Sequence, residues 1–435
     1  MAALALLVLF LAILGRGLNG ATKHAVNHPA ARRPVGIPAA ESGLLPWQLP
    51  RPLSREVVVA GPGDRLLILG GLVGSSSVPG IESLDTTTGG VRSITSLPAG
   101  VHDAAGALVG GRAFVFGGGS PTTVAAVDSF MAPAPAGRLG PFPGAPATGS
   151  GQLPQPRSDA SAASLGATTY IVGGYDGVKA DPAVLATRNG RSFQRVAWLR
   201  VPVRYPAVAA EDGRLYIFGG QAIAGAQAGR PVDDIQMVDP GRHAATVVGH
   251  LPEPLQAAAA VRLNGTIYLA GGDTSLPQPA GPGLGTTQLS PPVSPGPAAG
   301  LTTVSTIWAF KAPQGRMLVA GRLQVPVSHA GVAVLGSRAW LVGGESGGSQ
   351  LATVQMLTPN SSFGTAGSRG AGSPYFGGKL LVADRANNRL LLLNPAMQVI
   401  WTFPSPSLPR DPLGFFFPDD AFFVHHGTAI ISNQE

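Results

Sequence analysis

A short apolar stretch that ends in two adjacent glycines recurs six times along this chain of 435 residues. The doublets stand at Gly70–Gly71, Gly117–Gly118, Gly173–Gly174, Gly219–Gly220, Gly271–Gly272 and Gly343–Gly344. A large apolar residue stands three positions before the first glycine of each doublet: Leu67, Phe114, Tyr170, Tyr216, Tyr268 and Trp340. A repeat of roughly 50 residues indicates that each copy is one supersecondary unit, which buries its faces only against neighbouring copies. The doublets therefore restrict the chain to a repeat architecture.

Each copy contains the same succession of apolar stretches and turns. An apolar stretch and a turn such as AEDGR or LNGT precede the stretch that carries the doublet, and such turns are a strong hairpin signal. A polar loop, a third stretch such as IESLD or DDIQMVD, and a fourth stretch follow the doublet. The 61 glycines and 41 prolines favour short strands and tight turns over long helices. Four short antiparallel strands per copy predict an all-β fold, a propeller with six blades.

The doublet after the second strand, with an aromatic residue just before it, resembles the kelch-repeat β-propeller family. The resemblance covers residues 47–366, although the Tyr and Trp that this family carries downstream are mostly absent, and Trp198 stands where the third unit would have its Trp. Two stretches rich in Pro, Gly and Ser, residues 132–156 and 276–300, interrupt the repeat. Stretches of this length and composition are typical of disordered insertions or of functional lids.

The two ends of the chain depart from the repeat. The apolar run Ala2–Leu14 is shorter than the roughly 20 residues of a spanning helix, so residues 1–20 are expected to be a signal peptide or a signal anchor. Residues 21–46 are expected to be a tether. Residues 367–435 contain GGKLLVADRANNRLLLLNP, which resembles an NHL repeat and predicts a partial β-propeller segment. This segment is either part of a longer two-propeller protein, or packs on the ring, or pairs with another chain.

The composition excludes several classes of site and partner. The chain has no cysteine, which excludes disulfides, thiolate metal sites and the Cys–Tyr cross-link of galactose oxidase-like propellers. We expect no cofactor and no catalytic metal. The net charge is +7, but the arginines are scattered singly and no basic run interleaves with aromatic residues, so nucleic acid is not an expected partner. We expect an exported monomer, extracellular, periplasmic or at the cell surface, that contacts a membrane only through a possible anchor in residues 2–14.

Candidate binding residues lie where the innermost strand of each blade begins. Counting back fifteen residues from the first glycine of each doublet predicts one row of equivalent positions around the channel, with no gap in any unit. That row and the next contain the candidate channel-mouth residues Arg55, Glu56, His102, Asp103, Asp159, Arg204, Tyr205 and His329. Because neighbouring residues of a strand face opposite ways, we expect only one row to point into the channel. An alternative is that these strand ends are polar simply because they meet solvent.

Three functions remain open on this basis, of which the third is a purely architectural module that carries a partner through the NHL-like tail. The first is an exported, non-enzymatic scaffold that presents a propeller face to a protein or glycan ligand, and fold alone does not settle that function. The second is a carbohydrate-active enzyme that resembles the periplasmic sialic-acid mutarotases, which are also kelch propellers. In that case arginines would hold a substrate carboxylate, and carboxylates or histidines would transfer protons.

Overall fold

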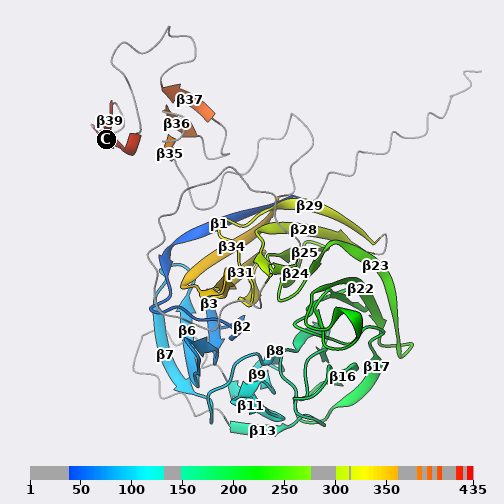
Figure 1. Ribbon diagram of the computed structural model, residues 1–435. Coiled ribbons are helices and arrows are strands. Elements are labelled where there is room, and N and C mark those ends of the chain that lie inside the picture. Colours follow the sequence, from blue (N-terminus) through cyan, green and yellow to red (C-terminus); the bar gives the residue numbers. More distant parts are fainter. Residues whose placement is uncertain are drawn as a thin grey trace, which may run out of the picture. The chain divides into compact units, whose positions relative to one another are not determined.

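Six antiparallel sheets of four strands each form a ring in the computed structural model (Figure 1). The structure describes residues 39–131, 148–275, 300–312 and 315–360, and the strands of residues 380–384, 389–393, 399–403, 418–424 and 429–434. The expected signal or anchor of residues 1–20 and most of both Pro/Gly/Ser-rich stretches lie outside these residues. Within them no helix is long and apolar enough to cross a membrane. The predicted six-bladed, all-β propeller is confirmed.

The blades follow one another along the chain, each listed from its innermost strand outward. Blades 1 and 2 are β2 (Val57–Ala60), β3 (Arg65–Leu69), β6 (Gly80–Asp85), β7 (Val91–Ser96), and β8 (Ala105–Val109), β9 (Arg112–Phe116), β12 (Ala126–Met131), β13 (Thr148–Gln152). Blades 3 and 4 are β14 (Ser161–Leu165), β15 (Thr168–Val172), β16 (Ala183–Thr187), β17 (Gln194–Trp198), and β19 (Ala207–Glu211), β20 (Arg214–Phe218), β22 (Val232–Asp239), β23 (Ala244–Leu255). Blade 5 is β24 (Ala259–Leu263), β25 (Thr266–Ala270), β28 (Thr306–Lys311), β29 (Arg316–Arg322).

Blade 6 joins the two ends of the ring. It contains β30 (Gly331–Leu335), β31 (Arg338–Val342) and β34 (Thr353–Asn360), and its outermost strand is β1 (Ala39–Gln48) from the start of the ring. Strand β1 pairs antiparallel with β34, and Figure 1 shows the two side by side, one blue and one orange-yellow. The propeller therefore begins at Ala39, inside the segment that was expected to be a tether.

Each doublet connects its blade to the next one. The N–H of the second glycine donates to a carbonyl in the loop that enters the following blade, as Gly118 does to Arg157 at 2.8 Å, and Gly344 closes the series by donating to Leu53. Gly117 has a φ of +65°, and a Cβ there would lie 2.1 Å from the carbonyl oxygen of Arg157. Glycine is therefore required because the next blade's backbone occupies the space of a side chain.

The hydrophobic core consists of six separate clusters, one between each pair of neighbouring blades. The cluster between blades 1 and 2, for example, joins Leu67 and Leu69 to Val115 and Phe130. The six large residues that precede the doublets are all buried, and each belongs to a different cluster. A sheet that is apolar on both faces can bury both only when it lies between two other sheets. A closed ring gives every blade two such neighbours.

Five pairs of two-residue strands lie on the face where the inner strands begin, and in each pair one strand directly follows a doublet. They are β4 (Leu72–Val73) with β5 (Ser76–Ser77), β10 (Gly119–Ser120) with β11 (Thr122–Thr123), β18 (Val203–Arg204) with β21 (Gln221–Ala222), β26 (Asp273–Thr274) with β27 (Thr302–Thr303), and β32 (Glu345–Ser346) with β33 (Ser349–Gln350). One turn of 3₁₀ helix, η1 (Gly225–Gln227), lies between β21 and β22. We call this side of the ring the mouth face.

The C-terminal segment forms two small sheets. Strands β35 (Leu380–Asp384), β36 (Arg389–Leu393) and β37 (Val399–Phe403) make one antiparallel sheet, and β38 (Pro418–Val424) pairs with β39 (Ala429–Gln434). The first of these sheets pairs β35 with β36, with Asp384 opposite Arg389. Its likeness to an NHL repeat stays a prediction.

Candidate functional site

A closed belt of six backbone hydrogen bonds encircles the channel at the mouth face. One residue just before each inner strand donates its N–H to the carbonyl of the equivalent residue in the preceding blade, at 2.7 to 3.1 Å. The six belt residues are Arg55, Asp103, Asp159, Tyr205, Ala257 and His329. All six have positive φ, between 52° and 60°, a conformation that non-glycine residues rarely adopt. The belt therefore holds six side chains in fixed positions around one axis.

The predicted rows of equivalent positions are wrong in the first unit by one residue. The belt places Arg55 with Asp103 and not with His102, and Glu56 takes the place of Ala104. The cause is the β2–β3 hairpin, in which Val57 pairs with Leu69, whereas Ala105 pairs with Phe116 in blade 2. Blade 1 thus has one more residue between the belt and the doublet. Counting back from the doublet misplaces its residues by that amount.

The Tyr205 hydroxyl links side chains from opposite sides of the channel. It accepts hydrogen bonds from Arg55 Nη1 at 3.1 Å and from Arg204 Nη2 at 2.9 Å, and it donates to Asp103 Oδ2 at 3.2 Å. Blades 1 and 4 face each other in a six-bladed ring, so these bonds cross the channel. The Tyr205 ring also meets the His329 ring edge to face, with centroids 4.7 Å apart. These side chains therefore meet across the channel at the belt.

Arg55 is bound by two carboxylates. Its Nη1 lies 3.0 Å from Asp103 Oδ2, and its Nε donates to Glu345 Oε1 at 2.7 Å. Burial alone would lower the pKa of Arg55, but Asp103 and Glu345 raise it above its ordinary value. Burial raises the pKa values of the Asp103 and Glu345 carboxyls. The Arg55 charge outweighs burial, so both pKa values lie below their ordinary values. Arg55 is therefore a fixed cation, and each of its three guanidinium nitrogens donates a hydrogen bond within the protein.

Arg204 and Asp159 form a second pair, 2.7 Å apart between Nη2 and Oδ2. The Arg204 guanidinium also stacks on Tyr175 and on Tyr205. Burial, reinforced by the nearby Asp103 charge and opposed by Arg204, raises the pKa of Asp159 to about 7. A carboxyl group that titrates near neutral pH is suited to proton transfer, and such groups are concentrated at functional sites. We call Arg55, Asp103, Asp159, Arg204, Tyr205 and Glu345 the mouth cluster.

The two histidines lie beside this cluster. His102 Nδ1 is 2.8 Å from the Ser77 hydroxyl, and its Nε2 is 3.8 Å from Asp103 Oδ2. His329 Nε2 is 3.9 Å from Asp273 Oδ2. Burial, with the Arg55 charge adding to it, lowers the pKa of His329. At neutral pH His329 is thus an uncharged imidazole.

Sequence reasoning missed Glu345 and Asp273. Both directly follow a doublet and bridge backbone to backbone with the residue before the belt, Ser328 in one case and Gln256 in the other. The available signal was their position immediately after the second glycine, which every blade places beside the channel mouth. The structure brings seven of the eight predicted residues to the mouth, and the Glu56 carboxyl lies instead against blade 6, where its Oε1 accepts the N–H of Gly331.

The channel behind the belt is narrow and lined mainly by small residues. A cavity of about 180 Å³ is bounded by the first residues of all six inner strands, which are alanine, glycine and valine apart from Glu56 and Ser161. A second cavity of about 110 Å³ lies at the belt itself and shares Glu56 with the first. Burial raises the pKa of Glu56 to about 8.

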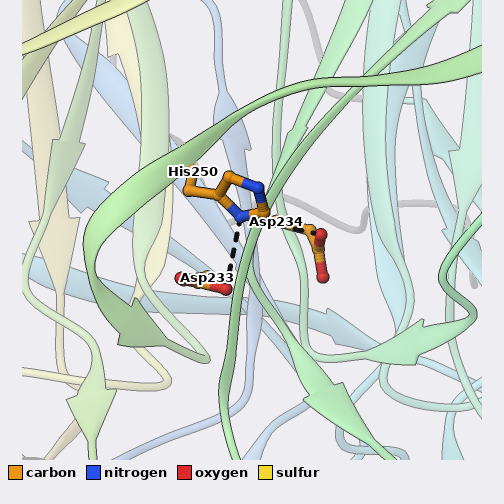
Figure 2. A group of neighbouring side chains, drawn as sticks. All are labelled: Asp233, Asp234 and His250. Atoms are coloured by element: carbon orange, nitrogen blue, oxygen red, sulfur yellow. Dashed lines mark ion pairs between the residues drawn. The ribbon is translucent and has the colours of Figure 1, made fainter.

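A separate polar group lies on the outer strands of blade 4. Figure 2 shows His250 between Asp233 and Asp234, with its Nδ1 at 3.5 Å and 3.8 Å from their carboxyl oxygens. The three ligand atoms are close enough to hold a metal ion. However, the His250 side chain is 62% exposed, and a surface ion pair accounts for the arrangement without a metal.

Comparison with known proteins identifies the architecture but no family. No family model matches the chain. Alpha-scruin of Limulus polyphemus is 29% identical over 134 residues, which are 29% of this chain and 14% of scruin's length. The solved structure of YjhT matches with a TM-score of 0.56 at 13% identity, covering 73% of this chain and 98% of that one. An identity this low shows a shared propeller fold alone.

Proposed function

We propose that this protein is an exported kelch-type binding propeller that receives a protein or glycan ligand on its mouth face without catalysing a reaction. The observation that carries the proposal is the mouth cluster. Charged side chains are scarce in this sequence, at 12%, yet five of them meet two tyrosines, Tyr205 and Tyr175, at one end of the channel. Binding sites are typically concave surfaces with a few fixed polar groups of this kind.

The ion pairs of Arg55 and Arg204 make a sugar acid an unfavourable ligand for the mouth cluster. A substrate carboxylate would have to displace Asp103 and Glu345 from Arg55, or Asp159 from Arg204. Breaking a buried ion pair leaves an uncompensated charge and is costly. Neutral hydroxyl groups or the side chains of a partner protein could instead bind beside the cluster while it stays intact.

Arg204 provides the test, because about a quarter of its side chain is exposed at the mouth. Full-length protein is screened by thermal unfolding and by a glycan array, as wild type, as Arg204→Ala and as Arg214→Ala. Arg214 is the matched control, since it also pairs with an aspartate, Asp239, but lies at the opposite end of blade 4. We expect ligands to be lost in Arg204→Ala and retained in Arg214→Ala. Ligands that bind both variants equally would contradict a site at the mouth.

A second candidate function, a carbohydrate-active enzyme resembling the sialic-acid mutarotases, is favoured by one observation. Asp159 has a pKa of about 7 and lies within the cluster that holds the Tyr205 hydroxyl. A sugar placed there could exchange a proton with Asp159 during ring opening and closure. The rate of anomer interconversion, followed by NMR for N-acetylneuraminate and glucose, separates the two functions. Acceleration that disappears in Asp159→Asn would support the enzyme, and unchanged rates would support the binding protein.

A further inference from the structure

A cavity of about 480 Å³ lies at the end of the ring opposite the mouth face. It is lined by the start of β15, the end of β16, the turn that follows β16 and the start of β17, all in blade 3, and by Pro240 of blade 4. Figure 1 shows β16 and β17 next to β22 and β23. Pockets that bind small molecules measure roughly 300–1,000 Å³, so this cavity is large enough for a ligand, whereas both channel cavities are smaller.

The strand pairing places the lining side chains on the face of blade 3 that packs against blade 4. Ala186 of β16 lies opposite Tyr170 on one side and opposite Gln194 on the other. Tyr170 belongs to the hydrophobic cluster shared with blade 4, and Ala186 packs against it. Thr168 and Arg188 stand two residues from Tyr170 and Ala186, so they share that face, and Arg188 Nε donates to Thr168 Oγ1 at 3.2 Å. The small Ala186 side chain leaves a hollow between two longer neighbours.

Blade 4 forms the other wall of the cavity. Pro240 begins the turn between β22 and β23, and His243 ends it. The His243 ring donates from Nδ1 to the Val196 carbonyl of β17 at 3.1 Å, so this turn is tied to blade 3. Asp239, which precedes Pro240, pairs with Arg214 at 3.8 Å and does not line the cavity. The two walls are therefore held together by contacts within the protein.

The cavity presents hydrogen-bond donors and a positive charge that no acid neutralises. No Asp or Glu lines it. Arg188 uses its Nε on Thr168, but within the described part of the chain neither of its Nη atoms makes a hydrogen bond or an ion pair. The Gln194 amide likewise has no hydrogen-bond partner among the described residues. Arg188 thus differs from Arg55 at the mouth, which two carboxylates already bind.

Tyr170 adds a hydroxyl group beside this charge. Its side chain is buried, and burial raises the pKa of Tyr170, whereas the nearby Arg188 charge opposes that rise. The hydroxyl is therefore protonated at neutral pH and able to donate a hydrogen bond. Arg188, Gln194 and Tyr170 together offer a charged fork and two neutral polar groups around the hollow at Ala186.

We propose that this cavity binds a small hydroxylated carboxylate, of the size of a sugar acid, with its carboxylate on the two Nη groups of Arg188. A guanidinium binds a carboxylate through two parallel hydrogen bonds. The ligand's hydroxyl groups bind Gln194 and Tyr170, and its carbon skeleton lies over Ala186. A cation is disfavoured by Arg188 and by the lack of an acid. The cavity and the mouth face lie at opposite ends of the ring, so this inference does not depend on the ligand proposed there.

The experiment measures binding of glucuronate to the full-length protein by titration calorimetry. Glucose, acetate and inorganic phosphate are titrated at the same ionic strength. We expect one glucuronate per chain, and we expect the other three compounds to bind about tenfold more weakly or less, because each lacks either the carboxylate or the hydroxyl groups. Glucose binding as tightly as glucuronate would show that Arg188 holds no charge of the ligand. Acetate or phosphate binding as tightly would show that the hydroxyl groups are not recognised, and an absence of glucuronate binding would overturn the proposal outright.

Two variants of one turn locate the site. Arg188→Gln removes the free guanidinium, and the affinity for glucuronate should fall about 10- to 100-fold. Arg191→Gln is the matched control, because Arg191 is also exposed in the turn between β16 and β17 but does not line the cavity. It should bind like the wild type, and the unfolding midpoints of both variants should match that of the wild type. Equal affinities in the two variants would overturn the proposal.

A third variant separates this site from the mouth face. Arg204→Ala changes the mouth cluster and should leave glucuronate binding unchanged. Loss of glucuronate binding in Arg204→Ala with retention in Arg188→Gln would place the ligand at the mouth and overturn the inference. A mouth face that binds no ligand would leave the expected results for glucuronate unaltered.

Discussion

Two buried carboxyl groups make the channel end sensitive to pH at the scale of single residues. Burial raises the pKa of Glu56 from 4.5 to about 8, and burial together with Asp103 raises that of Asp159 from 3.8 to about 7. At pH values between each group's ordinary pKa and its raised pKa, the folded protein keeps a proton that the unfolded chain loses. The stability from these two groups is therefore complete below about pH 4 and is lost as the pH rises through 7 and 8.

Substitution of Glu56 by Gln should flatten this dependence. The variant keeps the hydrogen bond to Gly331 but has no proton to lose, so its free energy of unfolding at pH 8 should exceed that of the wild type by on the order of 2 kcal/mol. At pH 4.5 the two proteins should be nearly equally stable. Denaturant unfolding from pH 4.5 to 8.5 measures the difference. A difference that does not grow with pH would contradict a buried, protonated Glu56.

At the scale of strands and loops, the glycine doublet is the feature with the clearest structural role. Each doublet ends the second strand of a blade and reaches the backbone entering the next blade, so one short motif serves both the strand and the ring. The sequence pattern predicts the blades from it correctly. It fails at the β2–β3 hairpin, because an added turn residue changes the count without changing the doublet, and it misses Glu345 because the contact partner Arg55 lies 290 residues away.

Alanine at Gly117 should show this double role. The substitution places a Cβ 2.1 Å from the Arg157 carbonyl at a φ of +65°, so we expect destabilisation of about 3 kcal/mol. Gly111 is the matched control, since its φ is +81° but nothing lies within 4 Å of a Cβ there. Gly111→Ala should cost about 1 kcal/mol from backbone strain alone. Equal losses in the two variants, measured by denaturant unfolding, would mean that the contact between blades contributes little.

At the scale of the whole molecule, the ring depends on a strand that the repeat did not predict. Strand β1 has the sequence AAESGLLPWQ, with neither a doublet nor strict alternation, and its place in blade 6 follows only from pairing with β34. The six doublets were enough to predict the number of blades. The ring closes through the pairing of β1 with β34, whose residues are about 300 positions apart in the sequence. Local sequence carries no signal for a contact over that separation.

Removal of β1 should therefore open the propeller. A chain that starts at residue 50 exposes the edge of β34 and one face of blade 6, and we expect it to aggregate or to lose cooperative unfolding. A chain that starts at residue 37 keeps β1 and should unfold at the same midpoint as the full-length protein. Light scattering and thermal unfolding distinguish the two truncations. A soluble, cooperative protein without β1 would show that the other five blades and three strands suffice.

The belt has a consequence for how such a protein can change over time. Every belt residue uses its backbone N–H and carbonyl in hydrogen bonds to its two neighbours in the belt. Ala257 shows that the belt forms without any contribution from the side chain. The side chains at these six places are therefore independent of the scaffold that carries them. New recognition could evolve there one substitution at a time, on a fold that stays the same throughout.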